Sequence, residues 1–183
     1  MLIGYIRKEI SNMINIRRAS CFDIDAVMPV ISSAQKYLAD QEIDQWQDDF
    51  PNRDVIMHDI VSAEAYVLTN GEDIAGYFVL YAPPEPVYEA LENGSWLYKG
   101  DNYSAMHRVA ISENYRGQGL AHIIYNKCEE RSVELGYDSL RVDTHPDNKI
   151  MRHMAESHGF MECGIVFYPG NLKRIAFEKV LGK

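Results

Sequence analysis

Apolar and polar positions alternate in several short runs of the chain and recur at helical spacing in others. Short alternating or apolar runs indicate strands, whereas apolar positions three and four residues apart indicate amphipathic helices. We predict helices over residues 23–39, 52–62, 119–135 and 148–158, with Asp23 capping the first. We predict strands from residue 13 onward and over residues 65–69, 74–81, 104–111, 139–143, 160–167 and 174–180.

The order of these elements indicates the fold class. Asn70-Gly71 stands between two predicted strands and is typical of a tight hairpin turn, so these strands are antiparallel. Helices and strands mix along the chain without a repeat, which predicts an α/β (α+β) fold with a mixed, largely antiparallel central sheet flanked by helices. Because 183 residues suit one domain, we interpret residues 13–183 as a single domain and residues 1–12 as an N-terminal extension.

Charge and composition exclude several classes of partner. With 18 basic and 27 acidic residues the net charge is −9, and the basic clusters Arg7-Lys8 and Arg17-Arg18 are too short to bind a polyanion, so we expect neither nucleic acid nor a membrane surface as partner. No apolar run is long enough to span a bilayer, and the first residues lack a signal-peptide pattern, so we expect a cytoplasmic protein. The three cysteines form no C-x-x-C pair, which argues against a disulfide framework or a metal site, and we expect them to be reduced packing residues.

The most informative motif is the run Arg-Gly-Gln-Gly-Leu-Ala over residues 116–121, between a predicted strand and a predicted helix. Gly117 and Gly119 allow a tight turn and a close approach of the main chain to a ligand. The exposed amides and the positive dipole end of the following helix favour a phosphate group. Neither a nucleoside triphosphate loop nor a complete dinucleotide-binding motif is present, so the run predicts a different site for a diphosphate-bearing molecule.

This Arg-x-x-Gly-x-Ala motif resembles the acetyl-CoA-binding core of the GCN5-related N-acetyltransferase (GNAT) superfamily. The resemblance covers residues 104–166, including the helix that opens at Asn148 and ends at Gly159-Phe160, and the order of elements from Ile14 onward agrees with that family. It implies a GNAT-like fold with acetyl-CoA as co-substrate and no metal.

The family's binding residues can be placed on this sequence. The resemblance implies that main-chain groups of Val109 and Ile111 pair with the pantetheine arm, and that Asn148 and Met151 line the same channel. A helix cap explains Asn148 equally well. The diphosphate is expected at the main-chain amides of the glycine motif, namely Arg116, Gly117, Gln118, Gly119, Leu120 and Ala121.

Family members usually transfer the acetyl group directly to an amine, with a main-chain amide of the central strand stabilising the developing oxyanion. A tyrosine that protonates the leaving thiolate often stands four residues before the Gly-Phe pair, and here that position is Ala155. A CoA thiolate can leave near neutral pH without full protonation, and Tyr168 is a distant candidate acid, although half-buried packing explains it as well.

The candidate general base is His107, because it lies on the strand that faces the thioester and histidine commonly titrates near neutrality. A histidine of the core whose hydrogen bonds are made within the protein explains the same residue. The neighbouring Arg108 points to the opposite face if the strand is regular. His145 is the weaker alternative base. A purely structural role in the turn before Pro146 explains this residue as well.

The acceptor is less well defined by the sequence. Five carboxylates surround Trp46 within residues 40–49, where the family's acceptor approaches, and they favour a cationic amine, although a solvated polar loop has the same composition. We expect an N-acetyltransferase that acts on a primary amine of a small molecule or peptide. A non-catalytic acetyl-CoA-binding module and an O-acetyltransferase are the alternatives. A homodimer is compatible with the resemblance, since many relatives form dimers.

Overall fold

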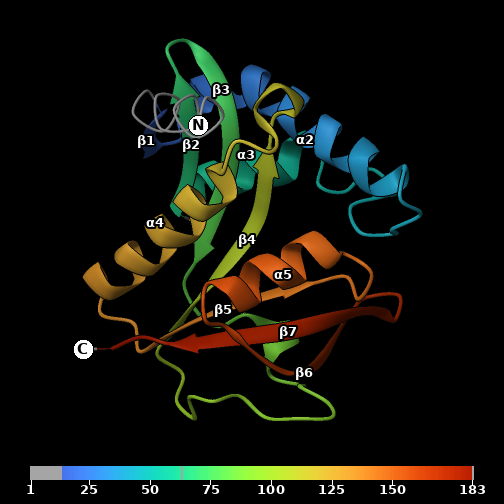
Figure 1. The fold of residues 1–183 in the computed structure, drawn as a ribbon, viewed down its shortest axis with the longest axis vertical. Helices are drawn as coiled ribbons and strands as arrows, with labels where there is room; N and C mark the ends of the chain where they lie inside the picture. Colours follow the sequence, from blue (N-terminus) through green and yellow to red (C-terminus); the bar gives the residue numbers. More distant parts are fainter. Residues whose placement is uncertain (1–13, 63, 183) are drawn as a thin grey trace, which may run out of the picture. The chain divides into compact units, whose positions relative to one another are not determined.

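The computed structural model describes residues 14–62 and 64–182, which form a mixed α/β fold (Figure 1). The strands are β1 (Ile14–Arg18), β2 (Glu64–Asn70), β3 (Asp73–Tyr81), β4 (Tyr103–Ile111), β5 (Ser139–Thr144), β6 (Met161–Tyr168) and β7 (Leu172–Val180). The helices are η1 (Cys21–Asp23), α2 (Ile24–Ala39), α3 (Arg53–Ser62), η2 (Pro86–Tyr88), η3 (Glu113–Tyr115), α4 (Leu120–Glu134) and α5 (Lys149–Ser157), where η marks a 3₁₀ helix. Every predicted helix and strand is present, with its ends shifted by two residues or fewer.

The pairing of the strands confirms the predicted sheet. The strands are hydrogen-bonded in the order β1-β2-β3-β4-β5-β7-β6. β4 pairs with β5 in parallel, whereas the pairs β1–β2, β5–β7 and β6–β7 are antiparallel. A parallel pair needs a crossover connection, and α4 provides it between β4 and β5.

The chain divides into two compact units. Of the described residues, unit 1 contains 14–62, 64–79 and 108–124, and unit 2 contains 80–107 and 125–182. Within unit 1, α2 packs against α3 and α3 packs against β2. The predicted N-terminal extension, residues 1–12, lies outside the described residues, and a single domain over residues 13–183 stays a prediction.

Helical spacing of apolar residues builds the core of unit 1. Val27 and Ile31 stand four residues apart in α2, which places them on one face of the helix, and both are completely buried. Ile56 of α3 is buried with them, and β2 is buried on both faces from residue 65 to residue 69. A strand buried on both faces reads as a continuous apolar run, as this one does in the sequence.

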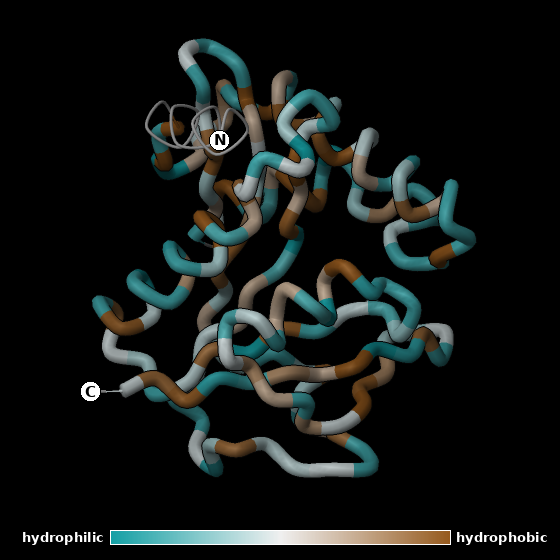
Figure 2. The backbone as a smooth tube through the Cα atoms, viewed as in Figure 1, coloured by the Kyte–Doolittle hydropathy of each residue, from teal (hydrophilic) through white to brown (hydrophobic). Residues whose placement is uncertain are grey.

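The hairpin between β2 and β3 is confirmed, with its turn one residue later than predicted. Asn70 is still paired with Ile14 of β1, and the turn residues are Gly71 and Glu72. Gly71 has a φ of 62°, a left-handed conformation that glycine adopts without a steric cost. Figure 2 shows this turn in hydrophilic colours, above strands that contain hydrophobic positions.

Asp23 caps a different helix from the one predicted. Its side chain makes no cap bond to α2; instead its Oδ2 accepts hydrogen bonds from the backbone N and the Oγ of Ser20, at 2.8 and 2.9 Å, at the start of η1. The guanidinium of Arg17 donates to both carboxylate oxygens at 2.7 and 2.8 Å. The Arg17 hydrogen bonds, followed by those from Ser20, hold the pKa of Asp23 well below its ordinary value, so the carboxylate stays charged.

We expect Asp23→Asn to lower the free energy of unfolding by about 1 kcal/mol at neutral pH, because a cap and a bidentate ion pair are lost. The folded-state pKa lies below the unfolded-state value, so this stabilisation is present above the unfolded pKa and is lost as pH falls through the folded pKa. Urea unfolding of both proteins between pH 7 and pH 2 should show the difference shrinking below about pH 4. Asp25→Asn is the control, because Asp25 is 84% exposed in its ion pair with Arg53; an equal loss there would contradict the assignment.

The core of unit 2 gathers around aromatic side chains. Tyr88, Tyr103, Val166 and Ala176 are buried together, and Trp96 packs against them. α5 packs against β5 and β6 and lies close to them in Figure 1. Strands β4, β6 and β7 and the long segment before β4 therefore share one core.

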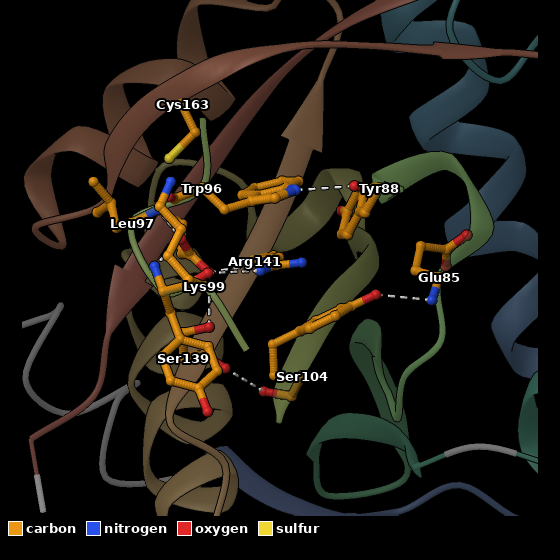
Figure 3. A network of polar contacts seen from close by, with 12 residues as sticks. Glu85, Tyr88, Trp96, Leu97, Lys99, Ser104, Ser139, Arg141 and Cys163 are labelled. Atoms are coloured by element: carbon orange, nitrogen blue, oxygen red, sulfur yellow. Dashed lines mark hydrogen bonds and ion pairs between the residues drawn. The ribbon is translucent and has the colours of Figure 1, made fainter. Parts of the chain in front are cut away.

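Polar contacts hold the segment of residues 82–102, which joins β3 to β4. Figure 2 shows most of this segment in hydrophilic or neutral colours, so apolar burial alone does not fix it. The Trp96 Nε1 donates to the carbonyl of Tyr88 at 2.9 Å, and the backbone N of Glu85 donates to the hydroxyl of Tyr103, also at 2.9 Å (Figure 3). The segment is therefore attached to β4 and to itself.

A buried carboxylate makes the strongest attachment. Glu178 of β7 is completely buried, and it accepts the backbone N–H groups of Leu97 and Tyr98 at 2.6 and 3.0 Å. It also accepts from the Ser139 hydroxyl at 2.7 Å and from Nε of Arg141 at 2.8 Å, both on β5. Arg141 lies at the centre of this network in Figure 3. One charge thus joins the long segment to two strands.

The cysteines differ in exposure, which corrects the expectation that all three pack in the interior. Cys128 and Cys163 are buried, and burial raises the pKa of both thiols. Cys21 is exposed at the start of η1. All three are free thiols, as predicted.

No described helix combines the length and the hydropathy needed to cross a bilayer. The described residues also contain no group of three or more His, Cys, Asp or Glu side chains placed to hold a metal ion.

Candidate active site

The glycine motif forms an open turn in unit 1, between η3 and α4. Gly117 has a φ of 73° and Gly119 a φ of 89°, and α4 begins at the next residue, Leu120. A Cβ added at either glycine would meet no atom within 4 Å. The main chain at this turn therefore faces open space, and a side chain at either position would enter it.

The main-chain amides of the turn are available to a ligand. Among the described residues, the N–H groups of Gln118, Gly119, Leu120 and Ala121 have no internal acceptor, and the first such bond of the helix runs from His122 N to Gly119 O at 3.1 Å. Unpaired N–H groups at a helix N-terminus carry partial positive charge and bind anions. A diphosphate fits this donor set.

The side chains of the motif point back into the protein. Arg116 donates to the carbonyl and the Oγ of Ser33 at 2.9 and 2.6 Å, and its guanidinium lies over the ring of Tyr37 at 4.6 Å. Gln118 donates to the Asn114 carbonyl at 2.9 Å. Arg116 thus fastens the turn to α2, a role that the sequence did not predict, and the ligand-facing groups belong to the main chain.

β4 is irregular at the point where the predicted site begins. The parallel pairing with β5 joins Tyr103–Ala105 to Ser139–Arg141 and ends there. Arg108 has a φ of 52°, which departs from strand geometry, so the expectation of a regular strand is wrong at this residue. Such irregularities re-aim the chain and are common beside active sites. Val109 and Ile111 follow in unit 1, which also contains the glycine motif.

A buried ion pair holds the irregular residue. Nε of Arg108 lies 2.8 Å from Oδ2 of Asp59, which is completely buried in α3. The guanidinium also lies over the ring of Phe50, 5.8 Å from its centroid. Removing one partner of a buried ion pair costs several kcal/mol of folding free energy, so the pair stabilises this conformation of β4.

His107, the candidate base, is surrounded by polar and aromatic groups of unit 2. Its Nε2 lies 3.2 Å from Oε2 of Glu85, without the alignment of a hydrogen bond. The imidazole meets the ring of Tyr81 edge-on at 5.3 Å and stacks on the ring of Tyr88 at 6.1 Å. The side chain is 12% exposed. His107 is therefore held on three sides while it retains access to solvent.

Tyr88 connects His107 to a second carboxylate. Its hydroxyl donates to Oδ1 of Asp143 at 2.8 Å, and the hydroxyl of Tyr168 donates to the same oxygen at 2.9 Å. Burial, followed by the charge of Asp143, raises the pKa of Tyr88 well above its ordinary value, so Tyr88 remains a protonated donor. The predicted acid Tyr168 thus has its proton directed at a carboxylate.

The other predicted site residues lie in unit 2, in local structural roles. Nδ1 of His145 accepts the N–H of Asp147 at 3.1 Å, which is the turn role considered for it. Oδ1 of Asn148 accepts the N–H of Met151 at 3.2 Å, so Asn148 is the N-cap of α5, again as considered. Ala155 is 1% exposed and has no proton to donate. The roles of His145, Asn148 and Met151 toward a ligand stay predictions.

Sequence reasoning missed two residues of the His107 cluster, Glu85 and Asp143. The sequence does indicate a possible site at Asp143, because it is a carboxylate near the carboxyl end of a strand whose preceding residues are all buried. Nothing in the sequence indicates a site at Glu85, because it lies between two prolines in a segment without periodicity.

Comparison with known proteins identifies the family. Residues 31–160 match the acetyltransferase (GNAT) family. A GNAT-family acetyltransferase from Streptococcus agalactiae is 34% identical, over 93% of this chain and 96% of that chain, with a TM-score of 0.84. A comparison with curated proteins gives no match. The chain belongs to the GNAT family of acetyltransferases.

Two more distant structures share the fold. A GNAT-family acetyltransferase from Listeria monocytogenes is 20% identical, over 92% of this chain and 95% of that chain, with a TM-score of 0.70. The PaiA N-acetyltransferase from Thermoplasma acidophilum, solved in complex with coenzyme A, is 15% identical, over 91% of this chain and 98% of that chain, with a TM-score of 0.68. The predicted GNAT-like fold is therefore confirmed.

Proposed function

We propose that this chain is an N-acetyltransferase that transfers the acetyl group of acetyl-CoA to a primary amine of a small molecule or peptide. The observation that carries the proposal is the row of unpaired N–H groups from Gln118 to Ala121 at an open glycine turn. Membership of the GNAT family supports acetyl transfer, and the Thermoplasma relative was solved with coenzyme A. When bound, acetyl-CoA supplies a thioester whose acetyl carbon an amine nitrogen attacks, so that a C–N bond forms and the C–S bond breaks.

The chain's own groups hold the co-substrate in this proposal. The amides from Gln118 to Ala121 bind the diphosphate, whereas the predicted amide of Arg116 already donates to the Glu113 carbonyl at 3.4 Å. The main-chain groups of Val109 and Ile111, beyond the end of the parallel ladder, bind the pantetheine arm as an added strand. Arg116 acts on the diphosphate through the turn, because its side chain is bonded to Ser33.

His107 takes the proton that the amine loses. A carboxylate 3.2 Å from Nε2 favours the tautomer with its proton on that nitrogen, which leaves Nδ1 as the acceptor. Glu85 is thus a positioning residue, and it also stabilises the imidazolium after proton transfer. No side chain at position 155 can protonate the leaving thiolate, and the acidity of the thiol makes this step less demanding.

Ala155 favours one second function, a module that binds acetyl-CoA without turnover. Calorimetry with CoA and acetyl-CoA, followed by thiol release in the presence of an amine panel, separates the two functions. CoA binding without release from any amine would support the non-catalytic module. The cytoplasmic location and the homodimer stay predictions.

We expect Gly119→Ala to weaken CoA binding roughly 10- to 100-fold, because the added Cβ enters the space in front of the amides and charge-assisted hydrogen bonds are lost. Gly136→Ala is the matched control: Gly136 has a φ of 82°, and its Cβ would also meet no atom within 4 Å. Both variants bear the same backbone strain of about 1–2 kcal/mol, so thermal melts should agree. Equal CoA affinities of the two variants by calorimetry would contradict a diphosphate site at this turn.

A further inference from the structure

Asp143 presents one carboxylate oxygen that the protein does not use. Both tyrosine hydroxyls, from Tyr88 and Tyr168, donate to Oδ1. Among the described residues, Oδ2 has no hydrogen-bond donor, and it is not among the buried polar atoms. A half-buried carboxylate loses part of its hydration, so a cation that reaches Oδ2 gains more than it would at an exposed carboxylate.

Two phenols fix the direction in which this carboxylate points. Tyr88 is 2% exposed and belongs to the core of unit 2, so its hydroxyl is a rigid donor. Tyr168 donates to Oδ1 from β6. The carboxylate is thus held by two tyrosines, which lie 55 and 25 positions away from it in the sequence. The nearby guanidinium of Arg174 lies over the ring of Tyr168, 6.0 Å from its centroid. Oδ2 is thus a preorganised acceptor that is not fully buried.

Tyr88 contacts both this carboxylate and the candidate base. Its ring stacks on the imidazole of His107, with 6.1 Å between the two centroids, and its hydroxyl donates to Oδ1 of Asp143. The base and the carboxylate are thus two separate polar groups beside one tyrosine, and each can take a different amino group of an acceptor. A molecule with two amino groups can reach both.

We propose that the acceptor carries a second cationic group, separate from the nitrogen that is acetylated, and that Oδ2 of Asp143 binds this group. This inference rests on the proposed function, and it narrows the acceptor class to diamines and similar dications. His107 faces the reacting amine, and Asp143 selects for the remote charge. A neutral group at the remote end of the acceptor makes no ion pair with Oδ2, and an anionic group is repelled by it.

The substitution Asp143→Asn tests the proposal with little structural change. The amide oxygen of asparagine can replace Oδ1 and accept both phenol bonds, while the NH₂ group replaces Oδ2, so only the charge and the second acceptor are lost. Asp101→Asn is the matched control, because Asp101 is exposed in the same unit and its substitution makes the same change in net charge.

The first measurement is kcat/KM for α,ω-diamines of three to six carbons and for amino alcohols of the same length, from the release of the CoA thiol. In the unmodified protein and in Asp101→Asn we expect the best diamine to exceed its amino alcohol roughly 10-fold or more, since an ion pair of this kind is lost in the alcohol. In Asp143→Asn this ratio should fall to about one. A ratio near one in the unmodified protein, or an unchanged ratio in Asp143→Asn, would overturn the inference.

The second measurement needs no turnover. The same diamine is titrated, without acetyl-CoA, into protein with labelled tyrosine rings, and Tyr168→Phe assigns one signal. We expect saturable shifts of the Tyr88 and Tyr168 rings that are absent from Asp143→Asn. If the shifts occur but no amine is acetylated and CoA does not bind, the proposed acetyl transfer fails while the cation site is supported. If the rings do not respond in the unmodified protein, the inference fails even where acetyl transfer is observed.

Discussion

Replacing Glu178 by glutamine is expected to lower the free energy of unfolding by about 3–5 kcal/mol, because it removes one partner of a completely buried ion pair. For a chain of this size the loss corresponds to a fall in melting temperature of roughly 6 to 20 °C. Thermal and urea unfolding monitored by circular dichroism provide the measurement.

The size of the effect follows from what the substitution leaves behind. Arg141 is the cross-strand neighbour of Glu178, and its guanidinium lies between the rings of Trp96 and Tyr103, 4.0 and 3.8 Å from their centroids. Without Glu178 this cation stays between two rings, in a place that water scarcely reaches. Glutamine also lacks the charge that strengthens the bond from Leu97, so the long segment before β4 loosens at the same time.

Two further variants separate the buried charge from a general effect of lost acidity. Glu162→Gln removes an equal charge on β6, where Glu162 is 48% exposed in its pair with Arg152, and it should cost less than about 1 kcal/mol. The double variant Arg141→Met, Glu178→Gln should cost less than the sum of the single variants, because no buried cation remains. Additive losses would show that the two residues do not stabilise the fold as a pair.

Local sequence patterns predicted the elements because each pattern has a local physical cause. Val27 and Ile31 recur at helical spacing, and Gly71 allows the left-handed turn after β2. The glycine motif at 116–121 was identified for the same reason, since φ values of 73° and 89° at Gly117 and Gly119 favour glycine at those positions.

The His107 cluster could not be predicted in the same way, because its contacts join distant parts of the chain. Tyr88 meets Asp143 across 55 residues, and no period or motif records that pairing. Arg116 belongs to the motif that predicted the diphosphate site, but its side chain is held by the hydroxyl and carbonyl of Ser33, 83 residues away, and the motif gives no sign of that contact. Which polar groups satisfy one another in the interior is decided by the packing of the whole unit.

Replacing His107 by glutamine is expected to lower kcat by roughly 100- to 10,000-fold, the range that a positioned general base contributes. The affinity for CoA should be unchanged, because the diphosphate and pantetheine arm are assigned to main-chain groups of Val109, Ile111 and residues 118–121, which the substitution does not alter. Glutamine cannot accept a proton near neutral pH, so the acid limb of the pH–rate profile should flatten as well. Steady-state rates of thiol release between pH 5.5 and 9 measure both effects.

The controls for His107 follow from its surroundings. His153→Gln changes an exposed histidine of α5 and should leave the rate and the profile unchanged. Glu85→Gln keeps the imidazole but removes the carboxylate 3.2 Å from Nε2, so it should cause a smaller loss of kcat than His107→Gln while the acid limb persists. If His107→Gln lowers the rate but retains the acid limb, the residue only packs against Tyr81 and Tyr88, and another group or water takes the proton. A profile that flattens only in His107→Gln assigns the proton transfer to this side chain.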